Sequence, residues 1–186
     1  MEILSNKKPS PARERILQTA RKLFYQDGIR ATGVDKIIAE ASVTKTTFYR
    51  HFKSKNNLII AYLEQRHQNL LQDFEKSINT KGKSVDAIIG TMEEWLTSEA
   101  FRGCAFLNSV GEIGETLPEV VEITQQHKQD LARLFETVLP DSPNRPEIAK
   151  GLALAVDGAT VKAQYDKDPA EAIALLKLIS QSIILA

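Results

Sequence analysis

The sequence lacks the residues that build disulfide-stapled, zinc-binding or membrane-spanning proteins. Cys104 is the only cysteine among 186 residues, which excludes an internal disulfide framework and a cysteine-rich zinc site. No apolar run reaches the roughly 18 residues of a membrane-spanning helix, and Met1–Leu4 is too short for the apolar part of a signal peptide. We therefore expect a soluble, cytoplasmic protein with no membrane partner, no bound metal and no other cofactor.

Signatures of catalysis are also missing. His51, His67 and His127 stand alone in the sequence, without the spacing that a metal site needs. There is no glycine-rich phosphate loop and no nucleophile motif, and the adjacent Glu93 and Glu94 would point apart on a helix. The sequence therefore indicates a protein that is not an enzyme.

The net charge of zero conceals an uneven distribution of charged residues. Residues 1–56 contain 12 Lys and Arg against 5 Asp and Glu, a net charge of +7, and residues 57–186 carry −7. A basic N-terminal third is suited to an anionic partner, which the acidic remainder would repel. The alternative is a chance segregation of solvated surface charges.

Helix signals fill the chain, and alternating strand patterns are absent. Ser10 and Pro11 form a helix start, and Gly28 is suited to the stop that follows. Thr32 and Asp35 have the spacing of a capping box, in which each side chain satisfies a free backbone donor near the other. The sequence predicts an all-α protein of about nine helices, at roughly 11–27, 34–41, 44–52, 55–78, 84–99, within 101–116, 118–139, 147–165 and 169–184.

The most informative stretch runs from Arg30 to Lys55. It contains two short helices joined by a tight connection at residues 41–43, the layout of a helix-turn-helix, whose second helix has the right width for the major groove of DNA. Hydroxyls and cations suited to phosphates and base edges would be exposed on that second helix, at Thr44, Lys45, Thr46, Thr47, Tyr49, Arg50 and His51.

This stretch resembles the N-terminal domain of the TetR family of bacterial transcriptional regulators, over about residues 13–60. The resemblance lies in an ordered set of positions: Thr32, Ile38-Ala39-Glu40-Ala41-Ser42-Val43, Thr44, Phe48-Tyr49, His51-Phe52 and Lys53-Ser54-Lys55. Two positions depart from the family pattern, since Ser42 and Thr46 stand where the family often has glycine.

The resemblance implies a role for each matched residue. Phosphates would be contacted by Thr32, Thr47, Tyr49, His51 and Lys55. Base edges would be reached by Lys45, Thr46 and Arg50, with Lys45 favouring guanine and the Thr46 methyl group favouring thymine. For Tyr49 and His51 the alternative is that they are ordinary surface residues.

The resemblance also implies an organisation and a function. Residues 10–70 would bind DNA, with the helix-turn-helix at about 33–52, and residues 71–186 would bind an effector and dimerise. We expect a sequence-specific regulator, a repressor that binds a palindromic operator as a homodimer and is released by a small-molecule effector that shifts the fourth helix. The alternative is an architectural or ligand-independent DNA-binding protein of the same fold.

Two stripes near the C-terminus are candidates for the dimer interface. The eighth helix repeats small residues every four positions, and the ninth has an apolar seam; the candidates are Gly151, Ala155, Ala159, Ala163, Ile173, Leu176, Ile179 and Ile183. The alternative is that both stripes face the core of their own chain.

A cavity between the middle helices would hold the effector. Its candidate lining is Met92, Trp95, Phe101, Cys104, Phe106, Leu107, His127, Leu131 and Phe135, although any one of these could be plain core. Cys104 could sense oxidants or electrophiles, but a free cysteine is usually a small buried apolar residue, and no basic neighbour is closer in the sequence than Arg102.

Overall fold

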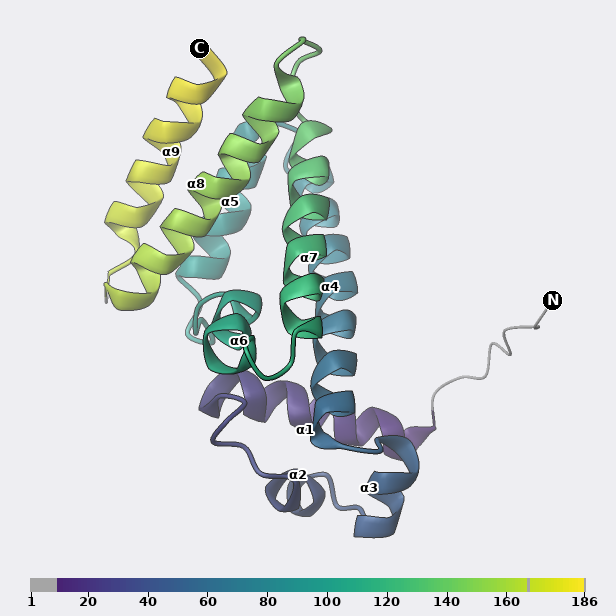
Figure 1. Cartoon of the computed structure of the whole chain (residues 1–186). Coiled ribbons are helices and arrows are strands. Elements are labelled where there is room, and N and C mark those ends of the chain that lie inside the picture. Colours follow the sequence, from purple (N-terminus) through teal and green to yellow (C-terminus); the bar gives the residue numbers. More distant parts are fainter. Residues whose placement is uncertain (1–9, 167, 186) are drawn as a thin grey trace, which may run out of the picture. The chain divides into compact units, whose positions relative to one another are not determined.

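The computed structural model describes residues 10–166 and 168–185, and within those ranges the chain is helical with no strand (Figure 1). The predicted all-α fold is confirmed. The helices are α1 (Pro11–Asp27), α2 (Val34–Glu40), α3 (Lys45–His51), α4 (Lys55–Thr80), α5 (Val85–Leu96), α6 (Ala105–Ile113), α7 (Glu119–Glu136), α8 (Arg145–Tyr165) and α9 (Ala170–Leu185). Among the described residues, no helix is both long enough and apolar enough to span a membrane.

The chain forms two compact units that divide between Leu63 and Glu64, inside α4. The first unit contains α1, α2, α3 and the start of α4, and the second contains the rest of α4 and the helices that follow. The predicted boundary after residue 70 lies further along the same helix.

Several helix starts are fixed by the side chains of the preceding residues. Ser10 Oγ accepts a hydrogen bond from the Arg13 amide at 3.2 Å, and Thr44 Oγ1 accepts one from the Thr47 amide at 3.1 Å. Ser84 caps α5 in the same way. Each such cap satisfies one of the backbone donors that a helix leaves open and is worth about 1 kcal/mol.

The predicted capping box at Thr32 is wrong. Gly33, not Thr32, is the N-cap of α2, and it makes no side-chain capping bond. Thr32 is fully buried, and its hydroxyl donates to the Gly28 carbonyl at 2.7 Å. The hydroxyl therefore satisfies a carbonyl left open after the end of α1, where it stabilises the connection between α1 and α2.

The core of the first unit holds the two short helices at a fixed angle. Ile37 of α2 and Phe48 of α3 are fully buried, and the Phe48 ring lies 6.2 Å from that of Phe52. In the same unit, Phe24 of α1 packs edge to face against Tyr62 of α4. Because α3 has only seven residues, its position depends on this packing more than on its own helix propensity.

In the second unit, α8 packs along both α7 and α9, as Figure 1 shows. The core of the second unit includes Leu152 and Val156 of α8, Phe135 of α7 and Leu176 of α9, all of them buried. A Cβ added at Gly151 of α8 would lie 3.5 Å from Cδ1 of Ile183 of α9, which is an ordinary van der Waals contact. Gly151 therefore packs against α9 of its own chain.

Candidate nucleic-acid interface and effector cavity

Helix α3 has one buried face and one face that offers polar groups to solvent. Phe48 is fully buried, whereas Lys45, Thr46 and Arg50 are exposed, and 44% of Tyr49 is accessible. The exposed face therefore presents two cations, a hydroxyl and a phenol side by side. These are the groups that hydrogen-bond to phosphate oxygens and base edges.

Thr44 and Thr47 lie at the N-terminus of α3 and bond to each other. Their hydroxyl oxygens are 2.9 Å apart, and Thr44 also caps the Thr47 amide. The Thr47 amide at the start of α3 is thereby capped, and backbone amides at a helix start attract anions.

His51 and Lys55 have structural partners within the first unit. Nε2 of His51 lies 3.1 Å from Oγ of Ser10, so the end of α3 is tied to the cap of α1. The ammonium of Lys55 donates to the Ile29 carbonyl at 2.6 Å. If His51 and Lys55 contact DNA, Ser10 and the Ile29 carbonyl already hold these two side chains in position.

Thr32 does not belong to this surface. Its side chain was expected at a phosphate, but it is fully buried with its hydroxyl directed at backbone carbonyls of α1 and the residue that follows. A phosphate oxygen has no access to it, so the predicted contact is wrong.

The turn between α2 and α3 is made without glycine. Ser42 has a φ of 52°, in the left-handed region that disfavours residues with a Cβ. This is one of the two positions where the sequence departs from the family pattern, so the chain accepts backbone strain at the turn that sets the angle of α3.

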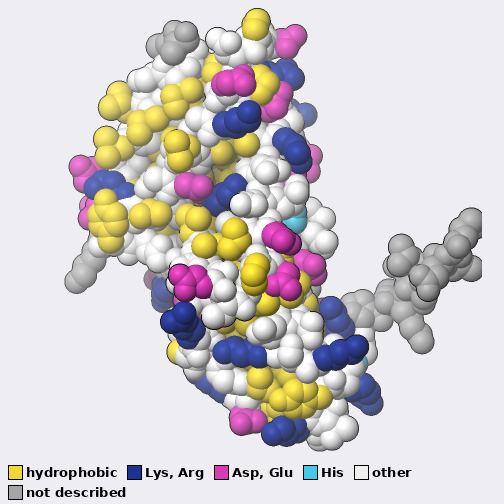
Figure 2. Space-filling model, viewed as in Figure 1, with side chains coloured by type: hydrophobic (Ala, Val, Ile, Leu, Met, Phe, Trp, Pro, Cys, Tyr) yellow, Lys and Arg dark blue, Asp and Glu magenta, His cyan; other side chains and the backbone are white. Residues whose placement is uncertain are grey.

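Basic side chains gather over the helices of the first unit in the view of Figure 2. Lys36 of this unit forms an ion pair with Asp27, whose carboxylate lies 2.8 Å from the ammonium and balances its charge. The exposed cations of this unit include Arg15, Arg21, Lys22, Arg30, Lys45, Arg50 and Lys53. The surface thus presents the positive charge that attracts a nucleic-acid backbone.

The second unit contains a partly open cavity of about 400 Å³, within the size range of small-molecule sites. Six of the nine predicted lining residues border it: Met92, Trp95, Cys104, Phe106, His127 and Leu131. The apolar wall is completed by Leu70, Phe74, Ala105 and Val156.

Three predicted lining residues lie elsewhere. Phe135 is fully buried behind Phe74, with 5.6 Å between the ring centres. Phe101 packs edge to face against Trp95 and borders a separate groove. Leu107 follows Phe106 on α6, where successive side chains point about 100° apart, so only Phe106 reaches the cavity.

Sequence reasoning missed the contribution of α4 and α8 to this cavity. From α4 come Arg66, Leu70, Asp73, Phe74 and Ser77, and from α8 come Val156, Asp157 and Thr160. The α4 residues recur at helical spacing, a signal that was present but indistinguishable from an ordinary core stripe.

Cys104 has a basic neighbour that the sequence did not reveal. Nζ of Lys128, on α7, lies 3.6 Å from Sγ of Cys104 and also pairs with Asp157 of α8. Arg102 is the basic residue nearest to Cys104 in the sequence, but Lys128, 24 positions away, contacts the thiol in the fold. Arg102 instead donates to the Glu99 and Phe101 carbonyls.

His127 is a buried polar residue of the cavity wall, with 4% of its surface exposed. Its ring stacks on Phe106 at 3.9 Å between centres, and its Nδ1 lies 3.2 Å from Nδ1 of His67. Burial lowers the pKa of His127 to about 3, with smaller contributions from the charges of Lys128, His67 and Arg66. The imidazole is therefore neutral at physiological pH.

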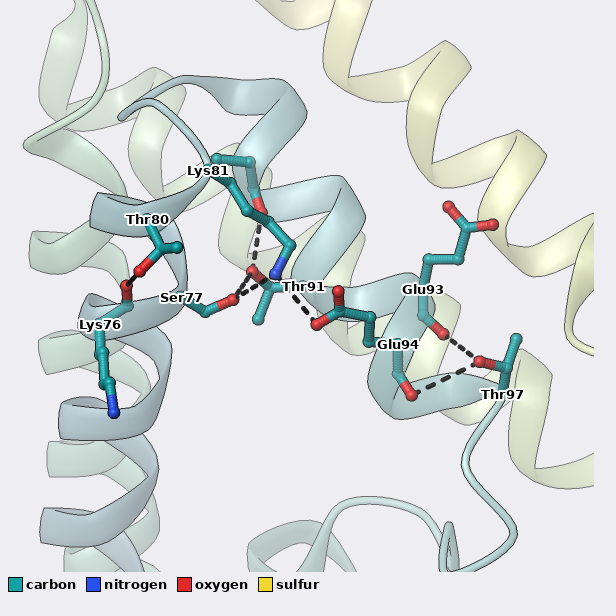
Figure 3. Close-up of polar contacts among 9 residues, drawn as sticks. Lys76, Ser77, Thr80, Lys81, Thr91, Glu93, Glu94 and Thr97 are labelled. Carbon is teal, nitrogen blue, oxygen red and sulfur yellow. Dashed lines mark hydrogen bonds and ion pairs between the residues drawn. The ribbon is translucent and has the colours of Figure 1, made fainter.

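A polar network joins α4 to α5 beside the cavity, as Figure 3 shows. The hydroxyls of Ser77 and Thr91 are 2.8 Å apart, and the Lys81 ammonium donates to both Ser77 and Glu94. Ser77, Thr91 and Glu94 also line the cavity. This side of the cavity therefore has its polar groups already paired.

Helices α8 and α9 leave several large apolar side chains exposed, and Figure 2 shows apolar side chains gathered on this part of the second unit. The exposed side chains differ from the predicted stripes: Ala159, Ala163 and Leu176 are buried, and Gly151, Ala155, Ile173 and Ile183 pack within their own chain or are only half-exposed. Of the eight candidates Ile179 alone is exposed. The exposed surface consists of Leu154, Val161, Tyr165, Leu175, Leu178 and Ile179.

Comparisons with known proteins agree with this architecture. The family model described as "Bacterial regulatory proteins, tetR family" matches residues 16–62. SCO4454, a TetR-family transcriptional regulator from Streptomyces coelicolor, superposes with a TM-score of 0.84 and 30% identity, over 96% of this chain and 90% of that one.

Two further relatives come from Escherichia coli. The HTH-type transcriptional regulator UidR is 26% identical over 146 residues, which are 78% of this chain and 74% of UidR. The reduced form of NemR shares the fold, with a TM-score of 0.77 and 22% identity over 90% of this chain and 96% of that one. The chain belongs to the TetR family of bacterial regulatory proteins, and it is a DNA-binding transcriptional regulator with a helix-turn-helix.

Proposed function

We propose that this regulator is a repressor without enzymatic activity, which binds a palindromic operator in the cytoplasm as a homodimer. A small molecule bound in the cavity of the second unit releases it from DNA. The cavity is the observation that carries effector control, because a close-packed interior leaves few voids larger than a water molecule. A filled interior would have favoured the alternative of an architectural DNA-binding protein.

The exposed face of α3 supports the assignment of DNA contacts. Lys45, Thr46 and Arg50 would read base edges, since their side chains are exposed on α3. Thr44, Thr47, Tyr49, His51 and Lys55 would bind phosphates. Thr32 is left out because it is buried.

The exposed apolar surface of α8 and α9 supports the dimer. Leu154 is 73% exposed, Tyr165 67% and Leu178 58%, which is unfavourable for side chains of this size unless another surface covers them. A two-fold copy would bury the same surface on both subunits and would present two α3 helices to a palindrome.

We assign each proposed activity to one of the two units. We assign DNA binding to the part of the chain that was predicted as residues 10–70, and effector binding and dimerisation to residues 71–186. Because Arg66 and Leu70 line the cavity, the working boundary moves to the division between Leu63 and Glu64.

Selection of bound fragments from genomic DNA tests the DNA part of this proposal. Recovery of a shared palindrome by the wild-type protein, and its loss on Leu178→Glu substitution, is the expected result. Enrichment without any shared sequence would leave only attraction to the phosphate backbone and would favour the architectural alternative.

Effector control is tested separately with a variant that fills the cavity. Leu70 lines it from α4 and is only half-buried, so Leu70→Trp should occupy the space without unfolding the chain. We expect this variant to bind the operator but to ignore compounds that release the wild-type protein. Release of both proteins at the same compound concentration would contradict effector binding in this cavity.

Oxidant sensing by Cys104 has its own test. A Cys104→Ser variant that is still released from DNA after oxidant treatment would refute a sensing role for this cysteine.

A further inference from the structure

The cavity of the second unit is extended along α4. The residues of α4 that line it run from Arg66 to Ser77. A helix rises about 1.5 Å per residue, so these two positions lie about 16 Å apart along its axis. Contacts with other helices mark the two ends: His67 meets His127 of α7, and Ser77 meets Thr91 of α5. Each end of the cavity therefore has its own set of side chains.

The end at Arg66 has more cations than carboxylates. Arg66 is buried, and Lys128, which follows His127 on α7, is half-buried; both line the cavity. Lys128 forms an ion pair with Asp157, which also lines the cavity. Two cations against one carboxylate give the lining of this end a formal charge of +1.

The pKa of His127 indicates the same sign of charge. Burial lowers this pKa most, and the charges of Lys128, His67 and Arg66 lower it further. A smaller, opposing contribution comes from Asp130. Positive charges near an imidazole disfavour its protonated form. The charged groups around His127 therefore produce a net positive potential at this end of the cavity.

The other end of the cavity has the opposite formal charge. Asp73 lines it one turn before Ser77 on α4, is exposed, and has no ion-pair partner among the described residues. Glu94 of α5 lines the same end, where the Lys81 ammonium donates to both Glu94 and Ser77 (Figure 3). Two carboxylates against one cation give this end a formal charge of −1.

Apolar side chains separate the two charged ends. Leu70 and Phe74 follow Arg66 at successive turns of α4, and Trp95 of α5 also lines the cavity. Arg66 and Asp73 are separated by two turns of helix, which is about 10 Å along the axis. A ligand that reaches both charges therefore needs an apolar body of about that length.

We propose that the effector is a rigid aromatic zwitterion, with a carboxylate at one end and an ammonium at the other. The carboxylate accepts hydrogen bonds from the guanidinium of Arg66, and the ammonium lies beside the carboxylate of Asp73. This inference rests on the proposed effector role of the cavity and names its ligand class. Hydrogen bonds between a guanidinium and a carboxylate are charge-assisted and often bidentate, so the Arg66 end contributes most of the selectivity.

The charge pattern also sets the orientation of the ligand. In the reversed orientation, like charges would meet at both ends, which is unfavourable. An aromatic anion leaves the Asp73 end without a counter-charge, and an aromatic cation leaves the Arg66 end without one. A zwitterion alone matches both ends and places its rings against Phe74 and Trp95.

Direct binding tests the proposal without reference to DNA. Trp95 is the only tryptophan in the chain and lines the cavity, so its fluorescence reports occupancy. The zwitterionic probe is 4′-(aminomethyl)biphenyl-4-carboxylic acid. The other probes are the anion biphenyl-4-carboxylate, the cation biphenyl-4-ylmethylamine and the neutral 4′-(hydroxymethyl)biphenyl-4-carboxamide. All four are titrated at pH 7.5, with calorimetry as a second readout.

The expected affinities differ because the two ends differ in burial. The zwitterion should bind about tenfold more tightly than the cation, which lacks the carboxylate for buried Arg66. It should bind about threefold more tightly than the anion, because an ion pair with exposed Asp73 is weak. The neutral probe should bind at least tenfold more weakly than the zwitterion.

Variants then locate the two charges. Asp73→Asn should abolish the preference for the zwitterion over the anion and leave the preference over the cation. Arg66→Gln should abolish the preference over the cation, whereas Arg66→Lys, which keeps the charge, should retain part of it. Glu75→Gln is the matched control, because it removes an exposed charge of α4 that does not line the cavity, and it should change neither preference. Thermal unfolding followed by circular dichroism confirms that each variant is folded.

Equal affinity of the wild-type protein for the zwitterion and the cation would overturn the proposal, as would equal affinity for the zwitterion and the anion. Preferences that survive in Asp73→Asn and Arg66→Gln, or failure of all four probes to bind, would also overturn it. Those outcomes leave effector control intact if another compound releases the operator through the cavity. Conversely, zwitterion binding that never releases DNA would support the ligand class and refute the proposed effector mechanism.

Discussion

Burial of His127 makes the folded protein sensitive to mild acid. In the unfolded chain His127 takes up a proton as pH falls below 6.5, whereas in the folded protein its pKa is about 3. The unfolded chain therefore binds more protons between these values, and the free energy of unfolding falls as pH drops through that window. Each step of one pH unit costs about 1.4 kcal/mol, so at pH 5.0 this residue alone removes about 2 kcal/mol relative to pH 7.5.

Urea unfolding at pH 7.5 and pH 5.0 measures this effect. His127→Gln removes the titrating group, and the loss of stability on acidification should shrink by about 2 kcal/mol compared with the wild-type protein. His51→Gln, the same substitution at a half-buried histidine of the first unit, is the matched control. If wild type and His127→Gln lose the same free energy between the two pH values, the argument from burial is refuted.

Three further predictions concern the turn, the DNA contacts and the dimer. Ser42→Gly should raise the free energy of unfolding by about 0.5–1 kcal/mol, because relief of the left-handed strain exceeds the added freedom of the unfolded chain; an unchanged or lower urea midpoint would contradict this. Lys45→Ala should relax sequence preference in competition binding, whereas Lys55→Ala should weaken all DNA about equally and also lower stability by about 1 kcal/mol through loss of the bond to the Ile29 carbonyl. Uniform weakening by both would refute the distinction between reading and positioning. Leu178→Glu should convert the dimer to a monomer in sedimentation, while the exposed substitution Gln125→Glu on α7 should not; a variant that stays dimeric would exclude this surface.

Local signals in the sequence were sufficient for the helices and for the helix-turn-helix. Ser10, Thr44 and Ser84 cap the helices that the sequence places after them, because a cap acts over three residues of chain. Thr32 shows the limit of such signals. Its spacing to Asp35 matches a capping box, but its hydroxyl reaches carbonyls at the end of the previous helix, which the spacing alone does not reveal.

Contacts between side chains of helices far apart in the chain could not be predicted from the sequence. Lys128 meets Cys104 and Asp157 only because α6, α7 and α8 converge there, and periodicity records which face of a helix is apolar but not which neighbour it meets. The same limit applies to the dimer surface. The small residues of α8 were expected between subunits, but they pack against helices of their own chain and leave Leu154 and Tyr165 outside.

The sequence by itself determined the helices, the helix-turn-helix with its polar face at Lys45, Thr46 and Arg50, and the resemblance to a family, because these depend on residues within a few positions of one another. The tertiary structure decided which of the apolar stripes are core, which face is open to a partner, and which polar groups reach the cavity. Those outcomes depend on how whole helices pack, and many packings are compatible with the same pattern of apolar and polar residues. The surroundings of His127 are of this kind, since its ring meets Phe106 and His67 only where α4, α6 and α7 come together.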